Sequence, residues 1–132
     1  MEMRCRILLI EAEPYVREIL AQVLEDLGGD VVRAGSGREG LALLRKGLAP
    51  RLVLLDPGAP QVDGVEFLEE MRALPEIARA PVVAMTVAPV PGGLLLQPLP
   101  FDGTLTKPFG LRELREVLVR FCRRENVSEL PG

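Results

Sequence analysis

The sequence predicts an α/β fold in which one five-stranded parallel sheet carries helices on both faces. Short apolar runs, of which 52–55 (LVLL) is the clearest, are typical of strands buried on both faces. They alternate with segments whose apolar residues recur at three- and four-residue steps, as in amphipathic helices. Such alternation implies a parallel sheet with right-handed crossovers. With 132 residues, 48% hydrophobic and 27% charged, the chain suits a single globular domain.

The first half of the chain supplies three strands (6–10, 30–34 and 51–55) and two helices (14–27 and 38–46). Pro14 suits the first turn of a helix, where its missing N–H costs nothing, and Gly28 begins the glycine pair that ends this helix. The second strand is short, which favours a place near an edge of the sheet. One buried face is expected in the first helix from Val16, Ile19, Leu20, Val23, Leu24 and Leu27, and in the second from Leu41 and Leu44.

The second half supplies strands at 81–86 and 103–106 and helices at 65–74 and 111–124. Between the last two strands, the segment 87–101 contains four prolines and a glycine pair. Each interior proline costs a helix ~3 kcal/mol, so a Pro/Gly-rich segment replaces the fourth helix of the usual alternation. The domain is expected to span 1–124, with a flexible tail at 125–132. The inward residues of these two helices are expected to be Phe67, Leu68, Met71, Leu114, Val117, Leu118 and Phe121.

The economical topology for these elements is the doubly wound strand order 2-1-3-4-5, and it brings four polar residues to one edge of the sheet. Glu11 and Asp56 follow the first and third strands, while Thr86 and Lys107 end the fourth and fifth. An isolated Asp at a strand end is usually a helix cap, but four such residues on one edge suggest chemistry. Mg²⁺ is bound by one or two carboxylates with waters and phosphate oxygens. An Asp beside it can act as nucleophile toward a phosphoryl group.

The chain resembles the receiver domain of bacterial two-component response regulators along nearly its whole length. The segments that match are LLIEAEPYVREIL, LVLLDPGAPQVDG, PVVAMT and LTKPF, and the second contains the family's strongest signature. The resemblance implies the flavodoxin-like fold and a phospho-acceptor at Asp56. It also implies that Thr86 and Lys107 bind the phosphoryl group, that Glu11, Asp56 and Gly58 hold Mg²⁺, and that the Lys107–Pro108 peptide is cis.

Several positions depart from the family pattern. Ala12 stands where the family usually has the carboxylate that touches Mg²⁺, so a weak or absent Mg²⁺ site is expected, with Glu13 as a substitute ligand. Val87 is larger than the small residue that the family prefers after the switch hydroxyl, and Thr104 replaces the aromatic switch residue. With the altered 87–101 segment, these changes affect the metal site and the signalling face together.

Two functions therefore stay open. One is a stand-alone receiver phosphorylated at Asp56 by a sensor histidine kinase and acting on a separate effector chain. The other is a pseudo-receiver that binds another signalling protein, or a second copy of itself, without phosphorylation. Neither is an enzyme in its own right.

A third alternative rests on Gly35, Gly37 and Gly40, which form a G-x-G-x-x-G pattern between a strand and a helix, with Asp56 about 20 residues further on. This spacing is that of a dinucleotide-binding fingerprint. It follows the second strand rather than the switch-point strand, so a turn in which Ser36 caps the next helix explains the same residues.

Composition narrows the remaining possibilities. The net charge of −3 provides no basic surface for nucleic acid, and the absence of histidine excludes His-based metal sites and bases. No signal peptide and no apolar run long enough for a membrane span are visible, so a cytoplasmic location is expected. Cys5 and Cys122 lie in apolar segments far apart in sequence, which favours buried free thiols over a disulfide.

Overall fold

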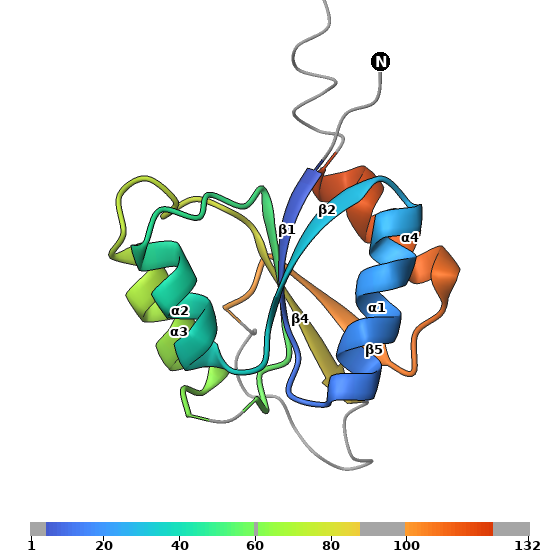
Figure 1. The fold of residues 1–132 in the computed structure, drawn as a ribbon, viewed down its shortest axis with the longest axis horizontal. Coiled ribbons are helices and arrows are strands. Elements are labelled where there is room, and N and C mark those ends of the chain that lie inside the picture. The colour runs from blue at the N-terminus through green and yellow to red at the C-terminus, as the bar shows by residue number, and fades with distance from the viewer. Residues whose placement is uncertain (1–4, 60, 88–99, 123–132) are drawn as a thin grey trace, which may run out of the picture.

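The computed structural model describes residues 5–59, 61–87 and 100–122, and in them the predicted α/β architecture is confirmed. Five parallel strands form one sheet in the order β2-β1-β3-β4-β5. Helices α1 and α4 cover one face and α2 and α3 the other (Figure 1). The strands are β1 (Cys5–Ile10), β2 (Gly29–Ala34), β3 (Leu52–Leu55), β4 (Val82–Val87) and β5 (Gly103–Lys107). The helices are α1 (Pro14–Asp26), α2 (Gly37–Arg45), α3 (Gly64–Arg72) and α4 (Leu111–Phe121).

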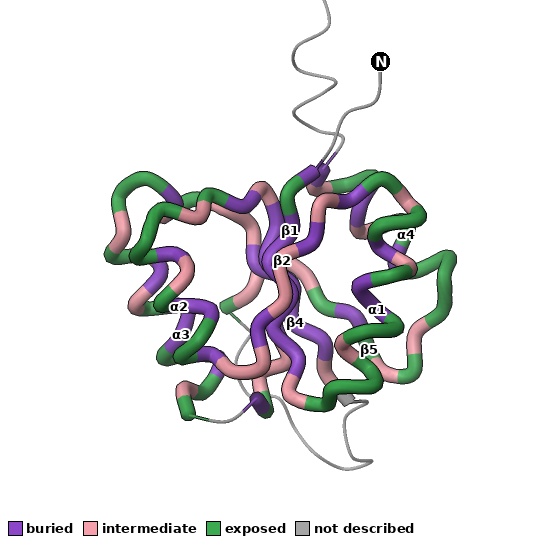
Figure 2. Tube along the Cα trace, in the orientation of Figure 1, coloured by how far each residue is buried: buried purple, intermediate pink, exposed green. Residues whose placement is uncertain are grey.

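The central strands are buried on both faces, as the continuous apolar runs predict. In β1, Ile7 and Leu9 pack toward α1 and α4, whereas Leu8 and Ile10 pack toward α2 and α3, because successive side chains of a strand point to opposite faces. The same alternation holds in β3. Figure 2 shows the buried segments gathered along the sheet and the exposed ones on the outer sides of the helices. Two apolar layers therefore sandwich one sheet.

The helices begin where the sequence offers caps. The side chains of Glu13, Ser36 and Asp63 accept backbone N–H groups in the first turns of α1, α2 and α3. For Ser36 this confirms the predicted cap. At α4 the cap residue is Gly110, whose N–H donates to the carboxylate of Glu113 at 2.9 Å. These contacts satisfy backbone groups that a helix end leaves without partners.

The predicted inward face of α1 is partly wrong. The buried residues of this helix are Leu20, Ala21 and Leu24, whereas Ile19 is 61% exposed and Val16 is 37% exposed. The helix packs through the side that carries the small Ala21, and this turns Ile19 toward solvent. Apolar periodicity locates a helix well, but it does not fix exactly how the helix is rotated about its axis.

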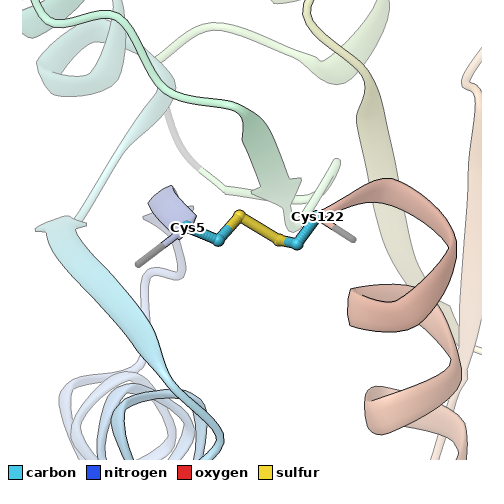
Figure 3. Close-up of a disulfide and its surroundings, with 2 residues drawn as sticks. All are labelled: Cys5 and Cys122. Atoms are coloured by element: carbon cyan, nitrogen blue, oxygen red, sulfur yellow. A yellow bond between two sulfur atoms is a disulfide. The ribbon is translucent and has the colours of Figure 1, made fainter. Parts of the chain in front are cut away.

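The prediction of free thiols is also wrong, because Cys5 and Cys122 form a disulfide (Figure 3). Their Cα atoms are 5.7 Å apart although 117 residues separate them in sequence. The first residue of β1 and the residue after α4 meet at the amino-terminal end of the sheet. Both sulfurs lie in the apolar layer beneath α1 and α4.

Parts of the predicted plan fall outside the described residues. These are most of the Pro/Gly-rich segment, the end of the last predicted helix and the 125–132 tail. Across the portion of the chain that is described, no helix is long and apolar enough to cross a membrane.

The Glu113 cap predicts a pH dependence of stability. The backbone N–H groups of Glu113 itself and of Gly110 donate to this carboxylate, and they hold its pKa below the ordinary value of 4.5. Because the folded state prefers the charged form, the stabilisation is complete above pH 4.5 and is lost as the pH falls through the lower folded pKa. Glu113→Gln keeps an acceptor but does not titrate. We expect the wild type to have a higher free energy of unfolding than Glu113→Gln, measured by urea unfolding, and this difference to shrink below pH 4.5. An unchanged difference between the two proteins at low pH would contradict this assignment.

Candidate functional site

Strand register brings the predicted polar residues to one edge of the sheet. Ile10 pairs with Leu55, so Glu11 and Asp56, which follow them directly, leave neighbouring strands at the same level. The backbone N–H of Asp56 donates to the carbonyl of Ile10 at 2.9 Å, which continues the ladder into the loop. Lys107 is the last residue of β5. All three lie at the carboxyl-terminal edge, where β4 points toward the bottom of Figure 1.

The side chain of Lys107 connects the two carboxylates. Its Nζ lies 3.3 Å from Oε1 of Glu11 and 3.7 Å from Oδ2 of Asp56. Glu11 is buried and is the one buried charged residue within the described ranges. Asp56 and Lys107 are about a fifth and a third exposed. The group therefore has two negative charges and one positive charge at a partly solvated edge.

The loop between β1 and α1 is held by backbone contacts. The other oxygen of Glu11, Oε2, accepts the N–H of Glu13 at 3.1 Å. Nη1 of Arg17 donates to the carbonyl of Glu11 at 2.9 Å and lies 3.5 Å from that of Ala12. The sequence gives no sign of this role of Arg17, because its spacing does not distinguish it from other arginines on amphipathic helices.

The carboxylate of Glu13 does not join the two acidic groups. Its Oε1 accepts the N–H of Tyr15 at 3.0 Å and so caps α1. The helix cap is therefore the role that this structure gives to the residue predicted as a substitute metal ligand.

The loop after β3 presents Asp56. Oδ1 of Asp56 accepts the N–H of Gly58 at 2.9 Å, and the Asp56 carbonyl accepts the N–H of Ala59 at the same distance. Further along, Asp63 caps α3, and a Cβ on Gly64 would lie 2.8 Å from Cβ of Pro57. The Asp-Gly pair of the signature thus has a structural explanation, since it starts α3 close against the loop that carries Asp56.

Thr86 lies on β4, the strand next to β3, and Thr104 lies on β5, at the end of the strand order. Thr86 is half-buried near the end of β4 and pairs with Thr106, one step from Lys107 along the ladder. Thr104 is exposed and lines a groove of about 430 Å³ between β5 and α4. The peptide bond between Lys107 and Pro108 is cis.

The donor set fits Mg²⁺ only in part. Two carboxylates on one rim are within the number that this ion uses in proteins. The methyl group of Ala12 cannot be a ligand, and among the described residues no group of three or more His, Cys, Asp and Glu is placed to hold a metal ion. The ammonium group of Lys107 already balances part of the negative charge.

The glycine fingerprint has a packing explanation. A Cβ on Gly37 would lie 2.9 Å from the backbone oxygen of Val62, and a Cβ on Gly40 would lie 2.6 Å from Cδ1 of Ile10. The N–H of Gly35 donates to the Glu39 carboxylate at 2.6 Å. These residues bring α2 close to the sheet and to the loop before α3, which is a structural need that the fingerprint does not reveal.

Comparison with known proteins gives a consistent picture. The family model for the response regulator receiver domain matches residues 7–119. An uncharacterised 14.6 kDa protein from Leptolyngbya boryana is 32% identical over 88% of each chain. The response regulator Rre1 from Synechocystis is 34% identical over 96% of this chain and 55% of its own length. The chain thus spans about half the length of this regulator.

A solved structure agrees with these matches. The receiver domain of a sensor histidine kinase from Pseudomonas aeruginosa PAO1, which has a magnesium ion in its active-site cleft, is 25% identical. The two structures superpose with a TM-score of 0.75, covering 90% of this chain and 98% of that one.

The packing role of the glycines is testable. Gly40→Ala forces Cβ against Ile10, so we expect a loss of roughly 1–3 kcal/mol of stability, measured by chemical unfolding. Gly35→Ala is the matched control, because its Cβ would meet only the ends of the Arg17 and Glu39 side chains at 3.2 and 3.5 Å. Equal losses in the two variants would contradict the packing explanation.

The ion contacts of Lys107 predict opposite effects of two substitutions. Lys107→Met leaves the buried Glu11 carboxylate without its cation and next to Asp56, so stability should fall by roughly 1–3 kcal/mol, less than for a fully buried pair because Lys107 is partly solvated. Asp56→Asn removes one of two like charges and should be neutral or stabilising. Thermal melts of both variants check this, and unchanged melting temperatures in both would show that solvent screens the whole group.

Proposed function

The chain belongs to the response regulator receiver domain family of two-component signalling, and from this membership we propose that Asp56 is its phospho-acceptor. The observation that carries the proposal is the contact of one lysine, Lys107, with both Glu11 and Asp56 at the carboxyl-terminal edge of the sheet. A carboxylate presented there by a strand end, with a cation beside it, can attack a phosphoryl group.

In the proposed reaction, a carboxylate oxygen of Asp56 forms a bond to phosphorus while the bond from phosphorus to the donor breaks. The donor is a phosphohistidine of a sensor kinase or a small acyl phosphate, and its leaving group departs with the bonding electrons. Lys107 would turn toward the new phosphoryl oxygens, and Thr86 would supply its hydroxyl from the neighbouring strand. The N–H of Gly58 already holds one oxygen of the acceptor carboxylate.

Magnesium would be held by Glu11, Asp56 and the backbone at Gly58, and when bound it would neutralise charge on the transferring phosphoryl group. We propose that this site is weak, because Ala12 provides no ligand and Glu13 caps α1. The family's solved member with magnesium supports the location of the site but not its strength here.

A second candidate function is a pseudo-receiver that docks a partner without phosphorylation. It is favoured by the contact of Lys107 with both carboxylates, which balances their charge without a metal ion. Thr104 supports it as well, since it offers no ring to couple the acceptor to the outer face. In this case the partner would be another signalling protein or a second copy of the chain.

Receiver domains are signalling modules. We therefore propose that this chain is not itself an enzyme. We propose likewise that the chain is cytoplasmic and acts on a separate effector chain. We also propose that it does not bind nucleic acid directly. The regulators it matches are about twice as long, so their complete activities are not carried over.

Phosphorylation decides between the two functions. The protein is incubated with Mg²⁺ and acetyl phosphate and its intact mass is measured. One added phosphoryl group that is absent in Asp56→Asn supports the first function. An unmodified wild-type protein under conditions that modify Ala12→Asp would support the pseudo-receiver.

The weak metal site predicts a gain on restoring the carboxylate. Ala12→Asp should raise Mg²⁺ affinity by at least ~10–100-fold, the range that even indirect supporting contacts of a metal site contribute. Ala12→Asn is the control, because it provides an oxygen without the charge and should gain less. Wild-type affinity equal to that of Ala12→Asp, measured by calorimetry, would mean that another ligand such as Glu13 moves to the ion.

A further inference from the structure

Helix α4 is attached to the sheet along a narrow stripe. Its buried residues are Leu114 and Leu118, and the next residue at the same four-residue spacing is Cys122. Val117 and Phe121 pack beside this stripe and are only partly buried. The third and last residue of this series is therefore a cysteine.

The disulfide converts that last contact into a covalent one. Cys5 is the first residue of β1, a strand with neighbours on both sides, since it pairs with β2 and β3. The end of α4 is thus bonded to a strand that is paired on both sides, and Figure 3 shows the bond. A bond that closes so long a loop also removes much conformational freedom from the unfolded chain.

The other end of α4 leads toward the proposed site. The helix starts four residues after Lys107, and its outer side lines the groove with β5 through Glu113, Glu116 and Arg120. The disulfide is at the opposite end of the sheet from Asp56, so it does not touch the acceptor. It joins the sheet to the end of the helix that forms one wall of this groove.

We propose that the Cys5–Cys122 disulfide is a redox-sensitive clamp that controls the docking of α4 on the sheet. A dithiol reductant attacks one sulfur, the S–S bond breaks, and a second thiol of the reductant resolves the mixed disulfide. Two electrons and two protons pass to the cysteines while the reductant becomes a disulfide. The last turn of α4 then loses its covalent anchor, and the wall of the groove loosens.

Burial limits the access of a reductant to the Cys5–Cys122 bond. Each cysteine is only 7% exposed, so a thiolate reaches the sulfurs when the end of α4 opens. Reduction and the opening of the helix therefore favour each other, because a reduced protein opens more easily and an open one is reduced more easily. The cytoplasm, which is the proposed location of this chain, is a reducing compartment. Disulfides in such compartments are usually catalytic or redox-sensing, and this agrees with a regulatory role for the Cys5–Cys122 bond.

Hydrogen exchange of the whole chain tests the proposal. The protein is compared oxidised and after treatment with a dithiol, with thiols counted by alkylation in denaturant. We expect no free thiols before treatment and two after it, matching the two cysteines of the chain. In the reduced protein the amides of Val117 to Phe121 should exchange at least ~10-fold faster, whereas those of β3 should change much less. The melting temperature should fall by roughly 10 °C or more.

The double variant Cys5→Ser/Cys122→Ser is the control for effects of the reductant itself. It should exchange like the reduced wild type with or without dithiol. Free thiols in the untreated protein, or equal exchange of α4 in both redox states of the wild type, would overturn the proposal. These readouts use the wild type alone, so they hold even if the double variant folds poorly, and none depends on phosphorylation of Asp56.

Discussion

The structure depends on the burial of β1 and β3 on both faces. Residues such as Leu8 and Leu54 are fully buried, so every backbone group of these strands needs a partner in the sheet, and their register is thereby set. That register places Glu11 and Asp56 side by side as the chain leaves the sheet. The polar edge is therefore a consequence of the core, because Glu11 and Asp56 directly follow the two buried strands.

The polar edge is arranged around a single cation. Lys107, the last residue of β5, contacts both Glu11 and Asp56 through its ammonium group. A buried Glu11 is tolerable because it has this ammonium group and the N–H of Glu13. The same contacts that support the proposed acceptor role of Asp56 also balance its charge without a metal ion. This double role is the reason why phosphorylation and phosphorylation-independent docking both deserve an experiment.

The two ends of the sheet carry different features. At the carboxyl-terminal end, loops carry the proposed chemistry, and their conformation is held by backbone contacts such as those of Arg17 and Gly58. At the amino-terminal end, the Cys5–Cys122 bond joins the start of β1 to the residue after α4. Helix α4 spans the distance between these ends. Its residues Glu113, Glu116 and Arg120 line the groove beside β5, so this groove lies between the polar edge and the disulfide.

The strand order, the Ser36 cap and the residues of the polar edge could be predicted from the sequence, because apolar period, prolines and glycines act locally and parallel topology leaves few choices. The caps at Glu13, Asp63 and Gly110 were not predicted. The sequence could not determine the rotation of α1, since the neighbours of Ala21 and Ile19 come from distant segments. The sequence also could not decide between a binding role and a packing role for the glycine fingerprint. The close approach of Ile10 to Gly40 supplies the packing explanation. The disulfide was decided by tertiary structure alone. Only the folded sheet brings residues separated by 117 positions within bonding distance, and no local pattern encodes that meeting.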